Sequence, residues 1–211
     1  MSWATAEFAS IILPDARLRR RLQQCSEQLS RAPQWSIPRA CGSWAATKGA
    51  YRLLSNPRVR SAAILKAHSD QTLLRCAAER EVLCLSDTTD VNLSRGCPAV
   101  GVGGMSDPHM RGFYAHILLA VTPGCQQLGV LRTHWIVRDP ATMGKRCAKR
   151  RELPITQKES YRWVEDFSAV NQHALAHPQT SFYYIADRES DVYELVMRWC
   201  RCCRTPDYSQ S

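Results

Sequence analysis

Apolar positions in the first third of the chain repeat at helical spacing. One stripe runs through Leu18, Leu22, Cys25 and Leu29. Asp15 precedes this stripe and is a residue type that caps helices, as are Ser43 and Ser61 further along. We therefore predict three helices, the second reaching about residue 54 and the third about residue 79.

The pattern changes after residue 81. Residues 82–85 form a short continuous apolar run, typical of a strand buried on both faces, and we expect it to end at Asp87. Two more strands, a helix, a strand and a last helix follow at 113–121, 128–137, 158–177, 182–186 and 190–199. A glycine-rich segment at 96–104 and a basic stretch at 138–157 are predicted as loops.

This order of elements predicts an α/β (α+β) chain. A helical head precedes three strands, and a helix, a strand and a helix complete the pattern. A ribonuclease-H-like fold begins in this way, as do other α/β folds. In such a sheet we expect His116 and His134 to be hydrogen-bonded strand residues, and Trp44, Trp135 and Trp163 to lie in the core.

Charge separates the two parts of the chain. The 211 residues carry a net charge of +9. Residues 1–75 contain twelve Lys and Arg against four Asp and Glu, whereas the remainder contains sixteen against fifteen. A basic head on a nearly neutral body indicates a polyanionic partner, most simply nucleic acid. The alternative is a helical surface that is basic and merely solvated. The sequence shows no secretory signal and no membrane span, so we expect a cytoplasmic protein.

Two predicted strands each end in an aspartate, Asp87 and Asp187. Carboxylates at the ends of neighbouring strands can converge, and oxygen ligands suit Mg²⁺ or Mn²⁺. The simpler interpretation is that aspartate often follows a strand as a turn former or a helix cap. Spacing alone leaves both interpretations open.

The strings around these aspartates resemble known motifs. LCLSDTTDVNLS surrounds Asp87 and FYYIADRESDVYELV surrounds Asp187. Both resemble the catalytic-aspartate motifs of DDE transposases, in particular the bacterial cut-and-paste group of the insertion-sequence-four family, Tn-five type. Similar strings follow in the family's order: KGAYRLLSNP at 48–57, GFYAHILLAVTP at 112–123, LGVLRTHWIVRDP at 128–140 and KESYRW at 158–163.

The resemblance implies that different parts of the chain have different functions. Residues 1–78 would form a transposon-end DNA-binding domain, 79–198 a ribonuclease-H-like catalytic domain, and 199–211 a tail that does not resemble the family. Asp87 and Asp187 would be catalytic and would bind Mg²⁺ or Mn²⁺. A basic face of the head would contact the DNA, and its predicted members are Arg17, Arg20, Arg21, Lys48, Tyr51 and Arg52.

One family feature is missing from the sequence. The third catalytic residue of the family is a Glu in a Tyr-Arg-Glu-Lys signature, which these 211 residues lack. The resemblance therefore implies a carboxy-terminally truncated transposase without its dimerisation region, inactive in DNA cleavage by itself. The alternative is a non-catalytic DNA-binding remnant, or an inhibitor that has a full-length transposase as its partner.

Overall fold

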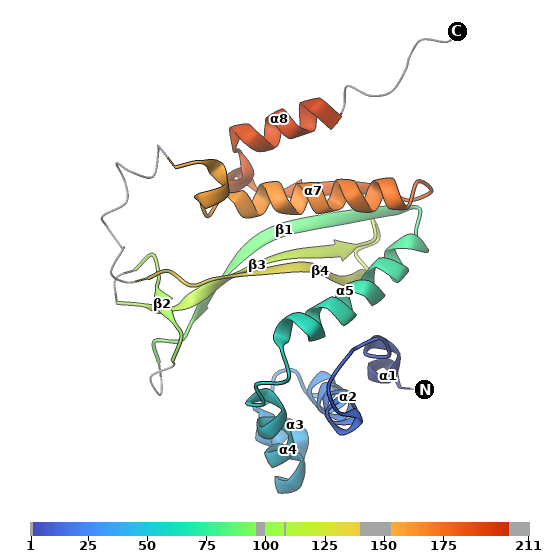
Figure 1. The fold of residues 1–211 in the computed structure, drawn as a ribbon, viewed down its shortest axis with the longest axis vertical. Coiled ribbons are helices and arrows are strands. Elements are labelled where there is room, and N and C mark those ends of the chain that lie inside the picture. Colours follow the sequence, from blue (N-terminus) through green and yellow to red (C-terminus); the bar gives the residue numbers. More distant parts are fainter. Residues whose placement is uncertain (1, 96–99, 108, 140–152, 203–211) are drawn as a thin grey trace. The chain divides into compact units, whose positions relative to one another are not determined.

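The computed structural model describes residues 2–95, 100–107, 109–139 and 153–202 (Figure 1). Parts of the two predicted loops and most of the expected tail lie outside these residues. The chain forms two compact units, Met1–Leu74 and Arg75–Ser211, which are described separately below.

The first unit is helical. It contains α1 (Trp3–Glu7), α2 (Ala16–Arg31), α3 (Ile37–Cys41), α4 (Trp44–Leu54) and most of α5 (Ser61–Ala77), which continues into the second unit. The prediction of α2, α4 and α5 is confirmed. The sequence pattern missed α1 and α3, because five residues are too few to show a helical period. No described helix combines the length and the hydropathy that a bilayer span requires.

Two of the three predicted caps form, whereas Ser61 is the first residue of α5 and not its cap. The Asp15 side chain accepts a hydrogen bond from the backbone N–H of Arg17 at 2.8 Å, and Ser43 Oγ accepts one from the N–H of Ala46 at 3.2 Å. These bonds satisfy donors that the first helical turn leaves without partners. The helices meet around one apolar core, whose buried members are Ala4, Phe8, Ile11, Leu22, Cys25, Cys41, Ala50, Leu53 and Ala67.

The second unit is built on a mixed five-stranded sheet. Its strands are β1 (Glu81–Asn92), β2 (Gly103–Gly104), β3 (Arg111–Val121), β4 (Gln127–Ile136) and β5 (Ser181–Ala186). The strand order is β2-β3-β1-β5, and β4 also pairs with β3. The β1–β3 and β3–β4 pairs are antiparallel, whereas β1 and β5 are parallel. Helices followed by this mixed sheet make an α+β chain, consistent with a helical head and a ribonuclease-H-like type of core.

One helix covers a face of this sheet. Helix α7 (Tyr161–Ala176) runs along β1 and β5 and buries Trp163, Val164, Phe167 and Val170 (Figure 1). On the other face of β5, Tyr183 and Ile185 remain 46% and 43% exposed. Two short 3₁₀ helices, η2 (Ile155–Gln157) and η3 (Arg188–Ser190), precede α7 and the last helix, α8 (Tyr193–Cys202).

Three expectations need correction. The first strand does not end at Asp87: antiparallel pairing with β3 extends β1 as far as Asn92, which lies opposite Gly112. The last helix starts at Tyr193, because Asp187 caps η3 instead. Of the three tryptophans expected in the core, only Trp163 is buried, whereas Trp44 and Trp135 are 77% and 53% exposed.

The cysteines of the second unit are expected to differ sharply in alkylation. Burial raises the pKa of Cys84 to about 12 and that of Cys76 to about 11, whereas Cys125 is exposed. Because the thiolate is the reactive form, iodoacetamide at pH 8 should modify Cys125 in the folded protein and leave Cys76 and Cys84 intact. Peptide mass spectrometry of native and urea-unfolded samples measures this. Equal native labelling of Cys84 and Cys125 would contradict the buried position of β1.

Candidate carboxylate pocket and DNA-binding groove

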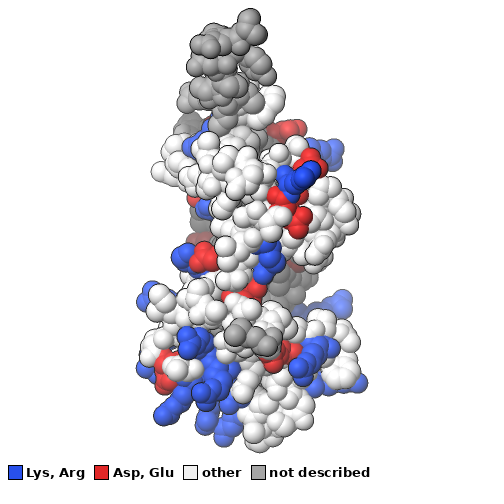
Figure 2. Space-filling view, turned by 90° about the vertical axis from the view of Figure 1, so that its right-hand side faces the viewer, with Lys and Arg blue, Asp and Glu red and all other residues white. Residues whose placement is uncertain are grey.

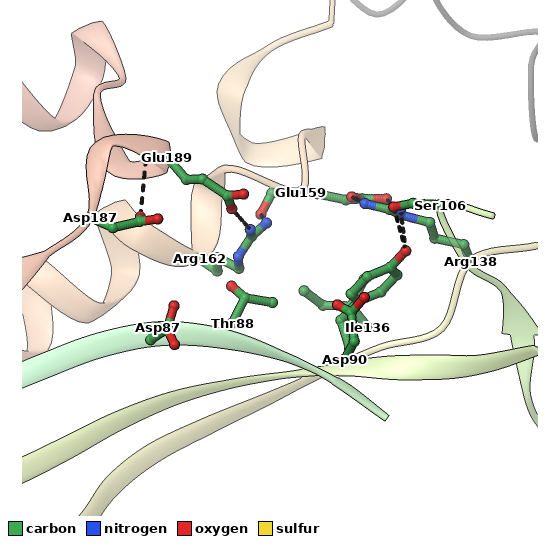
Figure 3. Close-up of a pocket in the computed structure, with 11 residues that line it drawn as sticks. Asp87, Thr88, Asp90, Ser106, Ile136, Arg138, Glu159, Arg162, Asp187 and Glu189 are labelled. Carbon is green, nitrogen blue, oxygen red and sulfur yellow. Dashed lines mark hydrogen bonds and ion pairs between the residues drawn. The ribbon is translucent and has the colours of Figure 1, made fainter. Parts of the chain in front are cut away.

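A polar pocket of about 340 Å³ lies beside the β1–β5 strand pair. Five carboxylate residues and two arginines contribute to it. Its lining residues are Asp87, Thr88, Asp90, Ser106, Tyr114, Ile136, Arg138, Glu159, Arg162, Asp187 and Glu189 (Figure 3).

The structure brings Asp87 and Asp187 to this one pocket. Ser86 of β1 lies beside Ala186 of β5 in the parallel register, and each aspartate is the next residue in its chain segment. The expected adjacency of the two aspartates is therefore confirmed, although Asp87 lies within its strand. Asp187 also acts as a cap, since its Oδ1 accepts a hydrogen bond from the N–H of Glu189 at 3.0 Å. The cap interpretation thus holds for Asp187, but it uses only one carboxylate oxygen.

Two arginines place positive charge among these acids. Arg162 donates to the carbonyl oxygen of Glu159 at 2.8 Å and lies 3.5 Å from a carboxylate oxygen of Glu189. In Figure 3 it lies between Glu189 and the β1 side chains Asp87 and Thr88. Burial lowers the pKa of Arg162, and its Nε has no hydrogen-bond partner among the described residues. A buried donor of this kind can bind an anionic oxygen.

Arg138 forms the other side of the pocket. Its guanidinium pairs with Glu159 at 2.7 Å and donates to the Tyr114 hydroxyl at 2.8 Å, while it stacks over the Tyr114 ring. The hydrogen bonds with Glu159 raise the pKa of Arg138. Neither arginine was predicted as a site residue. The available signal was the same for both: Arg162 lies in the KESYRW string and Arg138 in the LGVLRTHWIVRDP string.

The donor set fits a hard divalent cation only in part. Carboxylate oxygens are the ligands that Mg²⁺ and Mn²⁺ prefer, and Asp87 and Asp187 supply them from neighbouring strands. Within the described residues, however, no group of three or more His, Cys, Asp or Glu side chains is arranged to hold a metal ion. A cation at this pair would need further ligands from water, substrate phosphate or another carboxylate.

The first unit contains a basic groove between α2 and α4. We call it the α2–α4 groove; it has a volume of about 570 Å³, and its basic lining residues are Arg17, Arg21, Lys48, Arg52 and Arg58. Four of the six predicted DNA-contacting residues therefore lie together. The other two, Arg20 and Tyr51, are exposed but do not line the groove. Figure 2 shows Lys and Arg side chains gathered over this unit.

Arg21 enters the groove because α4 has a glycine opposite it. A Cβ placed on Gly49 would lie 2.7 Å from the Arg21 guanidinium carbon. The missing side chain thus allows the arginine to lie flat against α4. This close approach brings the charge of α2 beside Lys48 and Arg52, the groove-lining basic residues of α4.

A comparison with known families decides what this unit is similar to. Residues 1–59 match the family model for transposase DNA-binding. The match spans α1 to α4 and contains both walls of the α2–α4 groove. The match supports the interpretation that the chain is a transposase segment and that residues 1–59 bind DNA.

The exposed face of α4 also carries an aromatic residue whose exposure sequence reasoning missed. Trp44 begins the helix, and Lys48 lies one turn further along the same side. Trp44 was assigned to the core because its type favours burial, yet it is 77% exposed.

Proposed function

We propose that this chain is a DDE-type transposase segment similar to the insertion-sequence-four family, with transposon-end DNA bound in the α2–α4 groove. Asp87 and Asp187 serve as two of three carboxylates for phosphodiester cleavage and strand transfer. The position of both aspartates in one pocket, at the same level of the parallel β1–β5 pair, carries this proposal. The transposase DNA-binding match at residues 1–59 supports it independently.

The pocket residues would act on DNA through charge and position. Asp87 and Asp187 would hold Mg²⁺ or Mn²⁺, which when bound supplies an activated water and neutralises the leaving oxygen. Arg162 lines the pocket with a guanidinium whose Nε is buried, and it would orient a phosphodiester oxygen. Arg138 pairs with Glu159 and donates to the Tyr114 hydroxyl, and these contacts would keep the wall of the pocket in place.

Binding of Mn²⁺ to the whole chain tests the carboxylate assignment. We expect weak binding that is lost in both Asp87→Ala and Asp187→Ala, measured by the electron paramagnetic resonance signal of free Mn²⁺. Asp70→Ala is the matched control, because Asp70 is an acidic residue of α5 that pairs with Lys66 outside the pocket. Loss of binding in the control, or unchanged binding in both pocket variants, would contradict the assignment.

Cleavage by this chain alone is expected to be absent or barely detectable. Two carboxylates leave a bound cation with incomplete protein ligands, and a displacement of ~1 Å in reacting groups already reduces rates about a hundredfold. The measurement is nicking of transposon-end DNA with Mn²⁺, beside Asp87→Ala. Efficient cleavage that disappears in Asp87→Ala would show that this chain is a complete catalyst and would contradict the need for a third carboxylate.

A second candidate function is DNA binding without cleavage. The family match is confined to residues 1–59, and the described residues hold no three-ligand group. Such a chain would occupy transposon ends and inhibit a full-length transposase. Addition of the purified chain to a cleavage reaction of that enzyme separates the two: inhibition that persists in Asp87→Ala favours the binding function, and stimulation favours the catalytic one.

A further inference from the structure

A buried carboxylate joins α7 to the sheet. Asp166 is completely shielded from solvent, and its oxygens have four partners on three strands, one of which is Arg132 Nε of β4 at 3.5 Å. Ser86 Oγ donates to it at 3.0 Å from β1. His116 Nε2 of β3 and His134 Nε2 of β4 lie 3.1 and 3.0 Å from its carboxylate oxygens.

Asp166 is ionised in this environment. Burial by itself would raise its pKa, but the hydrogen bonds from His116 and His134 outweigh that effect and lower the pKa of Asp166 to about 2. An ionised carboxylate can only accept hydrogen bonds, so His116 Nε2 carries a proton directed at it. The charge is therefore held by named donors from β1, β3 and β4.

His116 connects Asp166 with β1. It is fully buried, and its ring meets Trp163 edge-on with a centroid distance of 4.3 Å. Its second ring nitrogen, Nδ1, lies 2.8 Å from Thr88 Oγ1. With the proton on Nε2, the Nδ1 atom is the acceptor of a hydrogen bond that the Thr88 hydroxyl donates. Asp166 and His116 thus hold Ser86 and Thr88, the two residues that flank Asp87.

We propose that Asp166 and His116 are positioning residues for Asp87. This inference rests on the proposed function, in which Asp87 is a metal ligand. The two residues touch neither metal nor DNA; they act through Ser86 and Thr88, which fix the β1 backbone on both sides of the aspartate. Arg162 lies one turn before Asp166 on α7, so the same contacts also keep the helix of Arg162 against β1.

Apolar residues at the positions of Asp166 and His116 would stabilise the packing of α7 on the sheet equally well. An apolar contact between α7 and the sheet avoids the desolvation of a carboxylate, and replacement of buried ion pairs by apolar groups is often neutral or stabilising. Hydrogen bonds differ in that they are directional. The Asp166–His116–Thr88 chain therefore restricts the position of β1 more narrowly than packing would, which is the property that second-shell partners of metal ligands have.

The experiment compares Asp166→Asn and His116→Gln with Thr180→Val. Asp166→Asn removes the charge, and His116→Gln retains an amide near the Nε2 position but loses the bond to Thr88. Thr180→Val is the matched control: it removes another buried hydrogen bond, from Thr180 Oγ1 to the Glu79 carbonyl at 2.9 Å, outside this network. The readouts are Mn²⁺ affinity and amide hydrogen exchange at residues 85–89, both on the whole chain.

We expect Asp166→Asn and His116→Gln to weaken Mn²⁺ binding about ten- to a hundredfold and to accelerate exchange at residues 85–89, while Thr180→Val leaves both unchanged. Wild-type affinity in Asp166→Asn, or an equal loss in Thr180→Val, would overturn the inference. If Mn²⁺ binding of the wild type is insensitive to Asp87→Ala, the proposed metal site fails. Exchange then decides the positioning role: acceleration at 85–89 in Asp166→Asn alone supports it, and unchanged exchange overturns it.

Discussion

Replacement of Trp163 by alanine is expected to lower the free energy of unfolding of the second unit by about 3–5 kcal/mol. Trp163 is 1% exposed and contacts the His116 ring, and the carbonyl of Trp163 accepts a hydrogen bond from the Tyr184 hydroxyl. Removal of the indole leaves a cavity between α7 and the sheet, because the surrounding side chains can close it only in part. Urea unfolding followed by circular dichroism measures the loss.

Trp135→Ala is the matched control for this prediction. Trp135 is 53% exposed on β4 and makes an edge contact with Phe113, so we expect a loss of only about 1 kcal/mol. Binding of transposon-end DNA should survive in both variants, because the α2–α4 groove belongs to the first unit. Equal destabilisation by the two substitutions, or loss of DNA binding in the Trp163→Ala variant, would contradict this prediction.

Removal of two charges from the α2–α4 groove is expected to weaken DNA binding and to flatten its salt dependence. Arg17 and Arg52 are exposed and line the groove from α2 and α4. If each neutralises one phosphate, the double variant Arg17→Ala/Arg52→Ala loses about two units from the slope of log K against log salt concentration. Fluorescence anisotropy with labelled duplex DNA between 50 and 200 mM NaCl covers the range in which such slopes are measured.

The control for this second prediction has the same change in net charge. Arg19 and Arg60 are also exposed in the first unit but do not line the groove. Arg19→Ala/Arg60→Ala should therefore retain most of the wild-type slope. A slope that falls equally in both double variants would show that the DNA responds to overall charge and not to the groove. An unchanged slope in Arg17→Ala/Arg52→Ala would show that the groove is merely solvated.

Local sequence determined most of the helices and strands. The helical stripe and the Asp15 cap predict α2, and the apolar runs predict β3, β4 and β5 to within two residues at each end. The sequence also located the basic excess in the first unit, and four of its predicted contact residues meet in one groove. These features depend on near neighbours in the chain, and periodicity and capping are properties of near neighbours.

The pocket forms through strand pairing between distant segments, which no local sequence pattern predicts. Antiparallel pairing with β3 carries β1 past Asp87, although the polar run of residues 86–90 indicates a turn. Parallel pairing then brings Asp187 beside Asp87 from one hundred residues away in the chain. Hydrogen bonding between strands overrides local preference because each added pair satisfies backbone groups on both strands.

Tertiary structure also decided the roles of single side chains. The sequence predicted that His116 is a hydrogen-bonded strand residue, and the structure confirms this, but its partners Asp166 and Thr88 come from α7 and β1. The burial of Trp163 and the exposure of Trp44 were likewise set by which helix face meets another element. A residue type gives the side chain its chemistry, whereas burial and partners depend on segments far apart in sequence that folding places in contact.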